Sequence, residues 1–200
     1  MTKDAVDKYL TVGSGPFNSE IKVQGSRFIS HILHASSGED AVVKYEETKK
    51  KFHDATHNCF AYRIDENQFR YSDDGEPSGT AGRPIFQILE GRKILQVLAV
   101  VTRYFGGTKL GTGGLIRAYS DSVKDGLQKI KLIEKIKSKE VKITTRYDLL
   151  RDVNEIISKY SGIVVTSDYS EKVVLVCQIP LSRYESFQKE MIHNIEITEL

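Results

Sequence analysis

The sequence has no tryptophan and only two cysteines, Cys59 and Cys177, and this scarcity limits the classes of protein it can encode. Both cysteines lie in apolar, strand-like runs, and neither a CxxC pair nor a framework of closely spaced cysteines is present. Zinc-knuckle and disulfide-stapled classes are therefore excluded. We expect two buried free thiols, which are typical of a reducing compartment such as the cytoplasm.

Long apolar runs are absent as well. One of the longest, 97–101, is far shorter than the roughly 20 residues that a membrane-spanning helix needs. Residues 1–15 contain neither the apolar core nor the cleavage pattern of a secretory signal. We therefore expect a cytoplasmic protein with no membrane partner.

Charge of either sign is not in large excess, since 29 lysines and arginines face 27 aspartates and glutamates. A net charge of +2 does not by itself indicate a nucleic-acid partner, so the distribution of the charges must carry that argument. The 40% hydrophobic and 28% charged residues are typical of globular proteins and exclude a wholly disordered chain.

The first two thirds of the sequence alternate between strand-like and helix-like segments. Apolar residues at every second position predict strands, and apolar residues three or four apart predict helices. Ser37 with Asp40 three residues later resembles a helix capping box. The strands that we expect are 17–23, 27–33, 58–64, 68–71 and a central, doubly buried one within 94–105; the helices are 38–53, 84–89 and one that follows residue 114 and ends near 130.

The pattern restarts after a lysine-rich segment, 132–138. The remaining residues predict the element order βαββαβ, which is the split-βαβ arrangement. We therefore predict an α+β protein with a first domain at 1–131, a linker at 132–138 and a second domain at 139–200.

A glycine-rich loop follows the central strand. Free N–H groups at the start of the next helix favour an anion, and neighbouring cations add positive charge. The spacing matches neither a Walker loop nor GxGxxG. We predict a phosphate or nucleic-acid contact; the alternative is a tight strand-to-helix turn with no ligand. The residues concerned are Arg103, Gly106, Gly107, Lys109, Gly111, Gly113, Gly114 and Arg117.

An acidic loop, SDDGEPSGTAG at 72–82, precedes the helix at 84–89. Its carboxylates could hold Mg²⁺ through a few contacts, but the EF-hand spacing is missing. The alternative that we favour is a turn in which aspartates bind backbone N–H groups, so no metal and no cofactor is predicted. The side chains that we expect to line a site here are those of Asp73, Asp74, Glu76, Ser78 and Thr80.

His57 and Cys59 are two residues apart and share one face of a predicted strand. Cysteine–histidine catalysis needs a thiolate beside a base and a third group that orients the base. The sequence shows no such third group. We therefore place both residues among those lining the site, expect a buried structural thiol and a hydrogen-bonded histidine, and predict no catalytic residue.

Several of these strings together carry a family resemblance. They are HNC at 57–59 with AY at 61–62, SDDGEPSGTAG at 72–82, RYFGG at 103–107 with KLG at 109–111, and GL at 114–115 with AY at 118–119. SRF at 26–28 fits an early motif. On these residues the sequence resembles the IMPACT/YigZ family, and the similarity covers nearly the whole chain.

The resemblance implies a fold and a cellular role. The implied N-terminal α/β domain is similar to the second domain of the small-subunit ribosomal protein S-five and to a domain of elongation factor G. The implied C-terminal domain is ferredoxin-like, βαββαβ, and similar to the last domain of that factor. Eukaryotic relatives are translational regulators that compete for the activator of a starvation-sensing kinase, and bacterial two-domain relatives resemble nucleic-acid or ribosome binders.

Three functions stay open at this point. We expect first a non-catalytic protein that binds RNA, the ribosome or translation factors and takes part in the regulation of translation. The second is a regulatory module whose acidic loop contacts a protein partner. The third is a metal-assisted enzyme acting on a phosphorylated substrate, if the acidic and glycine-rich loops meet in one cleft.

Overall fold

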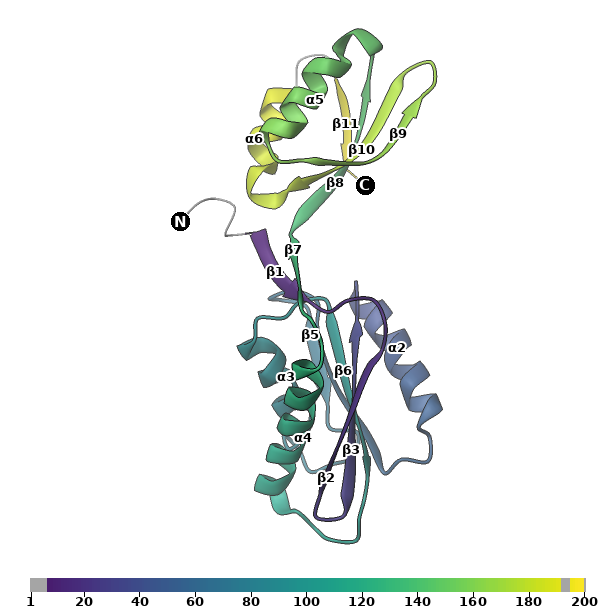
Figure 1. Cartoon of the computed structure of the whole chain (residues 1–200), viewed down its shortest axis with the longest axis vertical. Coiled ribbons are helices and arrows are strands. Elements are labelled where there is room, and N and C mark those ends of the chain that lie inside the picture. The colour runs from purple at the N-terminus through teal and green to yellow at the C-terminus, as the bar shows by residue number, and fades with distance from the viewer. Residues whose placement is uncertain (1–6, 192–194, 200) are drawn as a thin grey trace. The chain divides into compact units, whose positions relative to one another are not determined.

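A computed structural model describes residues 7–191 and 195–199 of the chain (Figure 1). The chain divides into two compact units, an N-terminal unit of residues 10–134 and a C-terminal unit of residues 7–9 with the described residues from 135 onward. Each unit has an apolar core of its own. The division between Glu134 and Lys135 falls inside the segment that the sequence predicts as a linker.

Part of the predicted linker is a β-strand. The strand β7 (Ile133–Ile136) pairs with β1 (Lys8–Thr11) in a two-stranded sheet, and the division between the units falls inside both strands. Neither strand is expected from the sequence. Each has only four residues, and the partner that makes it a strand is distant along the chain, so local periodicity gives no signal.

The N-terminal unit is built on a five-stranded antiparallel sheet. Its strands are β2 (Phe17–Val23), β3 (Ser26–His34), β6 (Val97–Tyr104), β4 (His57–Arg63) and β5 (Phe69–Ser72), in that order across the sheet. Every strand predicted for this unit is present within a few residues of its expected bounds. The continuous apolar run of β6 places it at the centre, where all but its last residue are buried.

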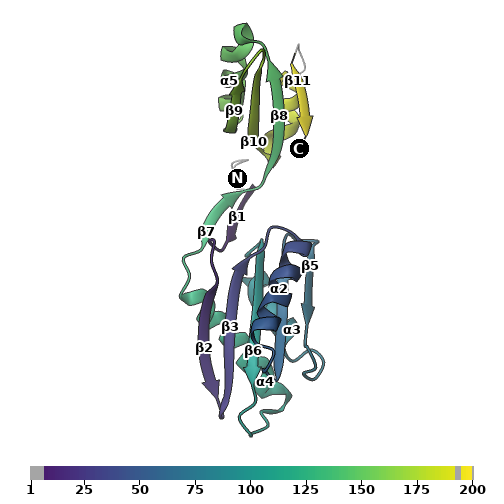
Figure 2. The same cartoon turned by 90° about the vertical axis from the view of Figure 1, so that its right-hand side faces the viewer.

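Helices cover both faces of this sheet (Figure 2). The helix α2 (Gly38–Lys51) lies on one face, and α3 (Gly82–Gly91) and α4 (Gly111–Gln128) lie on the other. Successive residues of β6 point to opposite faces of the sheet, and each face has its own apolar core. Val101 lies in the core beneath α3 and α4, and Val100 lies in the core beneath α2. The expected cap is present, since the Ser37 side chain accepts from the Asp40 N–H at 3.2 Å.

The C-terminal unit has the predicted βαββαβ order. Its elements are β8 (Ser138–Thr145), a short 3₁₀ turn (Tyr147–Leu149), α5 (Leu150–Lys159), β9 (Ile163–Tyr169), β10 (Val173–Pro180), α6 (Leu181–Met191) and β11 (Glu196–Glu199). The antiparallel sheet order is β11-β8-β10-β9, which together with the two helices confirms the α+β fold class. Leu200, the last residue of the predicted second domain, lies outside the described residues. Across residues 7–191 and 195–199, no helix has the length and apolarity needed to cross a membrane.

Candidate functional site

The acidic loop and the glycine-rich loop meet at one end of the N-terminal sheet. His57 and Arg27 pair with Arg103 and Tyr104, so the starts of β4 and β3 lie beside the end of β6. The glycine-rich loop leaves from this end, and the Phe105 N–H donates to Thr56 Oγ1 at 3.0 Å. The acidic loop arrives at the same end because Glu76 contacts Arg103. Antiparallel pairing has thus joined two strings that are distant in sequence.

Arg103 and Glu76 form a buried ion pair between these loops. Nη1 of Arg103 lies 2.6 Å from Oε1 of Glu76, and the two residues are only 5% and 8% exposed. The Tyr119 hydroxyl donates to the same carboxylate oxygen at 2.7 Å. The guanidinium also lies over the rings of Phe28 and Phe105, 5.4 and 5.5 Å from their centroids. Arg103 is therefore held inside the protein, where it joins the two loops.

Asp73 uses its carboxylate to close the acidic loop. Oδ1 accepts from the backbone N–H groups of Ala81 and Gly82 at 2.9 and 2.8 Å, and Oδ2 accepts from that of Gly79 at 2.8 Å. These bonds satisfy amides at the start of α3, which has no side-chain cap at Ala81. Asp73 therefore shapes the loop.

Asp74 is held in the left-handed backbone region, with φ of 41°. Its carboxylate accepts from Lys49 Nζ at 2.9 Å and from the Asn58 N–H at 2.7 Å. The hydrogen bond to Asp74 raises the pKa of Lys49 above its ordinary value. A positive φ is unfavourable for a residue with a side chain and is usually adopted by glycine. The bonds to Lys49 and Asn58 compensate this cost at Asp74.

The two hydroxyl residues of the acidic loop differ in exposure. Thr80 is buried, and its hydroxyl donates to the carbonyl of Pro77 at 2.6 Å. Ser78 is exposed. Of the two, Thr80 stabilises the turn and Ser78 is accessible from solvent.

Cys59 is fully buried beneath the acidic loop. Its Sγ lies 3.0 Å from the carbonyl oxygen of Asp73 and 3.3 Å from the hydroxyl of Tyr119. Burial raises the pKa of the Cys59 thiol well above its ordinary value. A thiol that stays protonated is a weak nucleophile, so this environment suits a structural cysteine.

His57 is oriented by the backbone of the acidic loop. Its Nδ1 lies 2.7 Å from the carbonyl oxygen of Asp74, and a carbonyl can only accept, so Nδ1 carries the proton. Its Nε2 lies 4.0 Å from Oε1 of Glu76. His57, Asp74 and Glu76, all predicted from the sequence, are thus brought together, with Cys59 packed beneath the same loop.

The glycines of the later loop fall into two groups. Gly106 packs against the β2–β3 turn so closely that a Cβ atom would lie 1.9 Å from the carbonyl carbon of Gly25. Its N–H donates to Ser26 Oγ at 3.1 Å. Gly107, Gly111 and Gly113 are exposed, and a Cβ atom on any of them would meet no atom within 4 Å. Gly106 is exposed too, but its close packing fixes the loop, whereas the second group leaves open space for an external ligand.

The helix α4 begins earlier than the sequence suggests. Gly111, Gly113 and Gly114 lie in its first turn, whereas the sequence predicts them in the loop. Leu110 precedes this turn and provides no side-chain cap, and the turn contains no acidic residue. Its amide groups and positive dipole end are therefore available to an anion.

Lys109 and Arg117 are the predicted cations that reach solvent. Both are exposed, one shortly before α4 and the other in its second turn. Neither side chain forms a hydrogen bond or ion pair with any residue that the structure describes. Asp73, Asp74 and Glu76 do not contact Lys109, so the acidic loop faces Arg103 alone among these cations.

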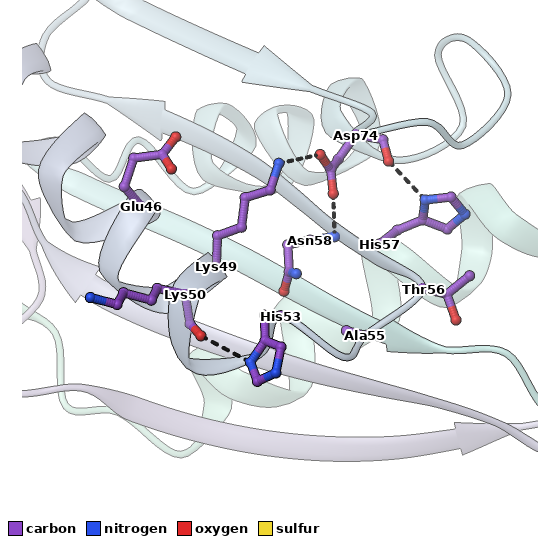
Figure 3. A pocket seen from close by; sticks show the side chains of 9 residues that line it. All are labelled: Glu46, Lys49, Lys50, His53, Ala55, Thr56, His57, Asn58 and Asp74. Atoms are coloured by element: carbon purple, nitrogen blue, oxygen red, sulfur yellow. Dashed lines mark hydrogen bonds and ion pairs between the residues drawn. The ribbon is translucent and has the colours of Figure 1, made fainter.

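An open pocket of about 580 Å³ lies between the C-terminal part of α2, the start of β4 and Asp74 (Figure 3). The Lys49–Asp74 ion pair crosses one side of it, and His57 points away from α2 toward the Asp74 carbonyl. The residues that line it are Glu46, Lys49, Lys50, His53, Ala55, Thr56, His57, Asn58 and Asp74. The part of the chain that the structure describes holds no group of three or more histidine, cysteine or carboxylate side chains placed to bind a metal.

Sequence reasoning missed four residues that shape this site. Tyr119 and Lys49 supply bonds to Glu76 and Asp74, and Ser26 binds the N–H of Gly106. Phe105 is 47% exposed beside the glycines. Ser26, Phe105 and Tyr119 had a signal, since they lie within the motifs SRF at 26–28, RYFGG at 103–107 and AY at 118–119. Their contacts, and the role of Lys49, depend on segments that are distant along the chain.

Comparison with known proteins agrees with this two-domain α+β organisation. Residues 24–127 match the model of the Impact N-terminal domain, and residues 143–194 match that of a domain of unknown function, DUF1949. The first match covers most of the N-terminal unit, including both loops, and the second lies in the C-terminal unit. The chain belongs to the IMPACT family, as the resemblance of its motifs predicts.

Two curated relatives and one solved structure show how far the similarity extends. The chain is 38% identical to IMPACT family member YvyE of Bacillus subtilis, over 86% of this chain and 80% of the relative. It is 32% identical to IMPACT family member YigZ of Escherichia coli, over 90% of each. A crystal structure titled only as a hypothetical protein is similar over 97% of this chain and 98% of its own, with 29% identity and a TM-score of 0.68.

Proposed function

We propose that this chain is a non-catalytic RNA- or ribosome-binding protein of the cytoplasm that regulates translation. The observation that carries the proposal is the segment from Gly107 to Arg117, most of which is exposed. It combines uncapped helix amides, glycines open to close approach and two cations without protein partners in the described chain. Such a combination favours phosphate.

The roles within the segment differ. Lys109 and Arg117 supply positive charge to phosphate groups, and Gly107, Gly111 and Gly113 let the nucleic-acid backbone approach the amides. Arg103 acts from beneath, because its bond to Glu76 fixes the end of β6 from which the loop leaves. Gly106 anchors the other side of the loop against Gly25.

The family resemblance directs the proposal to translation. Its eukaryotic members are translational regulators, and the domains that it implies are similar to those of a ribosomal protein and an elongation factor. A phosphate-binding loop on such a scaffold suits ribosomal or messenger RNA as the partner.

Catalysis is the less favoured function because of how the acidic loop is built. The Asp73 and Asp74 carboxylates are occupied by backbone amides and Lys49, and the Glu76 carboxylate by Arg103 and Tyr119. Carboxylate oxygens with these partners stabilise the fold. The acidic loop therefore supports the glycine-rich loop, which is the part that binds RNA.

The test is RNA binding by the full chain and by a Lys109→Ala, Arg117→Ala double variant. Fluorescence anisotropy with a labelled single-stranded RNA, over a series of salt concentrations, should show weaker binding by the double variant. The slope of log K against log salt should fall in magnitude by about 0.7 for each phosphate group that is no longer neutralised. Co-sedimentation with purified ribosomes should show the same order of affinity.

The matched control replaces two cations at the other end of the sheet. Arg92 and Lys93 precede β6, whereas the proposed loop follows it, so Arg92→Ala with Lys93→Ala removes equal charge away from the site. The control variant should bind RNA like the unaltered chain. Equal losses of affinity in both double variants would show that only net charge matters and would refute the site.

A further inference from the structure

We infer that the ligand of the glycine-rich segment is single-stranded RNA and that Phe105 stacks on one of its unpaired bases. The inference rests on the proposed function and names its substrate class. Phe105 is the last residue before Gly106, and 47% of its surface is exposed. It is therefore the one large apolar side chain of the run 105–109, beside amides and a cation suited to phosphate.

Two contacts position Phe105, one at its backbone and one at its ring. Its backbone N–H donates to Thr56 Oγ1 at 3.0 Å, which fixes the start of the loop. The Arg103 guanidinium lies 5.5 Å from the ring centroid and is itself fixed by Glu76 and by the ring of Phe28 on the core side. An aromatic ring positioned before binding loses little conformational entropy when a base stacks on it.

Other exposed aromatic side chains of this unit have a different environment. Phe69 and Tyr71 both pack on the ring of Phe86, with centroids 4.7 and 5.7 Å away, and so extend the apolar core. Within the described residues, no aromatic ring pairs with Phe105. The Arg103 guanidinium contacts its ring instead. An aromatic ring that packs on a cation, and not on another ring, can present a face to a base.

The surroundings favour RNA over an apolar peptide. Gly106, Gly107, Thr108 and Lys109 follow the ring and bring no apolar side chain. Leu110, which comes next, packs against the core, and the next exposed apolar residue, Ile116, lies in α4. A protein hot spot needs an apolar cluster with a surrounding rim. A nucleotide needs one stacking ring, a phosphate site and a cation a few residues apart, and this loop provides them.

Single strands are preferred to duplexes for a geometric reason. Bases in a duplex are stacked on one another and have no free face, whereas an unpaired base can place its face on a side chain. A duplex has the higher charge density, so a purely electrostatic site would bind it at least as well. A higher affinity for the single strand than for the duplex therefore indicates that a base stacks on the protein.

The experiment compares Phe105→Ala, Phe105→Leu and Phe105→Tyr in anisotropy titrations with a labelled single-stranded RNA and with its duplex. The single strand should bind more tightly than the duplex. Phe105→Ala and Phe105→Leu should weaken single-strand binding about tenfold, and Phe105→Tyr should restore it, because stacking needs an aromatic face. The salt slope should be the same in all three variants, since each keeps the cations that neutralise phosphate.

Phe69→Ala is the matched control, because Phe69 is 44% exposed on the same unit. It should leave RNA binding unchanged. Equal affinity for duplex and single strand, or unchanged binding by Phe105→Ala, would overturn the inference even if the Lys109→Ala, Arg117→Ala variant still binds more weakly. Full retention of affinity by Phe105→Leu would overturn it too, because apolar packing without stacking would then suffice. Unchanged binding by the lysine and arginine double variant would instead refute the proposed function itself.

Discussion

Arg103 and Glu76 are 27 residues apart in sequence, and their side chains meet at 2.6 Å in a buried ion pair. Tyr119 on α4 binds the same carboxylate, so one oxygen atom joins β6, the acidic loop and the helix that follows the glycine-rich loop. A buried pair of this kind contributes little net stability but fixes one geometry strongly, because removing either partner leaves the other charge unpaired.

Glu76→Gln should therefore destabilise the protein more than an ordinary loss of charge. The Arg103 guanidinium would stay buried without a compensating charge, and we expect the free energy of unfolding to fall by about 3 kcal/mol. Urea unfolding followed by circular dichroism measures this. The exposed Arg27–Glu20 pair offers a control, since Glu20→Gln breaks a pair in contact with solvent and should change stability little. Similar losses of stability in both variants would contradict the role given to burial.

The two groups of glycines should respond differently to a methyl group. Gly106→Ala would bring a Cβ atom to 1.9 Å from the backbone of Gly25, and the required shift should cost about 2 kcal/mol of stability. Gly113→Ala meets open space in the first turn of α4 and should not reduce stability. Thermal unfolding of the two variants compares them directly. A stable Gly106→Ala protein would show that the close approach of the two loops is not needed.

Stability should fall as the pH is lowered because of His31. This residue is 5% exposed, with Asn18 and Thr102 at hydrogen-bond distance from its ring nitrogens, and burial lowers its pKa from 6.5 to about 4, with a smaller contribution from Lys51. The unfolded chain takes up the proton near pH 6.5 and the folded chain only near pH 4, so protonation favours unfolding between these values.

Between about pH 7 and pH 5 the His31 contribution should lower the free energy of unfolding by about 2 kcal/mol. Urea unfolding at a series of pH values measures the slope. A His31→Gln variant lacks this titration, so its stability should depend less steeply on pH over the same range. Parallel curves for the two proteins would show that His31 is not the group responsible.

Cys59 should resist alkylation in the folded protein. Its thiol is buried and has a raised pKa, so little thiolate is present and little reagent can reach it. At about pH 8 we expect iodoacetamide to modify it at least about a hundredfold more slowly than in urea-unfolded protein. Mass spectrometry of peptides separates it from Cys177, whose pKa burial raises to about 11. Rapid native modification of Cys59 would restore the case for a nucleophile.

The acidic loop shows why the composition of a site is easier to predict than its chemistry. The sequence places Asp73, Asp74 and Glu76 within four residues, and the structure gives each a different task, since Asp73 binds amides, Asp74 binds Lys49 and Glu76 binds Arg103. Each task depends on which distant segment packs against that carboxylate. No spacing rule contains this information.

The sequence by itself determined the elements that repeat a local pattern. The alternation in 17–23, the apolar run of β6 and the βαββαβ order after residue 138 follow from side chains that must face a core at a period of two or of about 3.6 residues. The tertiary structure alone decided the pairing of β1 with β7, the close approach of Gly25 to Gly106, and the burial of Arg103 against Glu76. These contacts join segments far apart along the chain, and the energy that selects them comes from packing and desolvation in three dimensions.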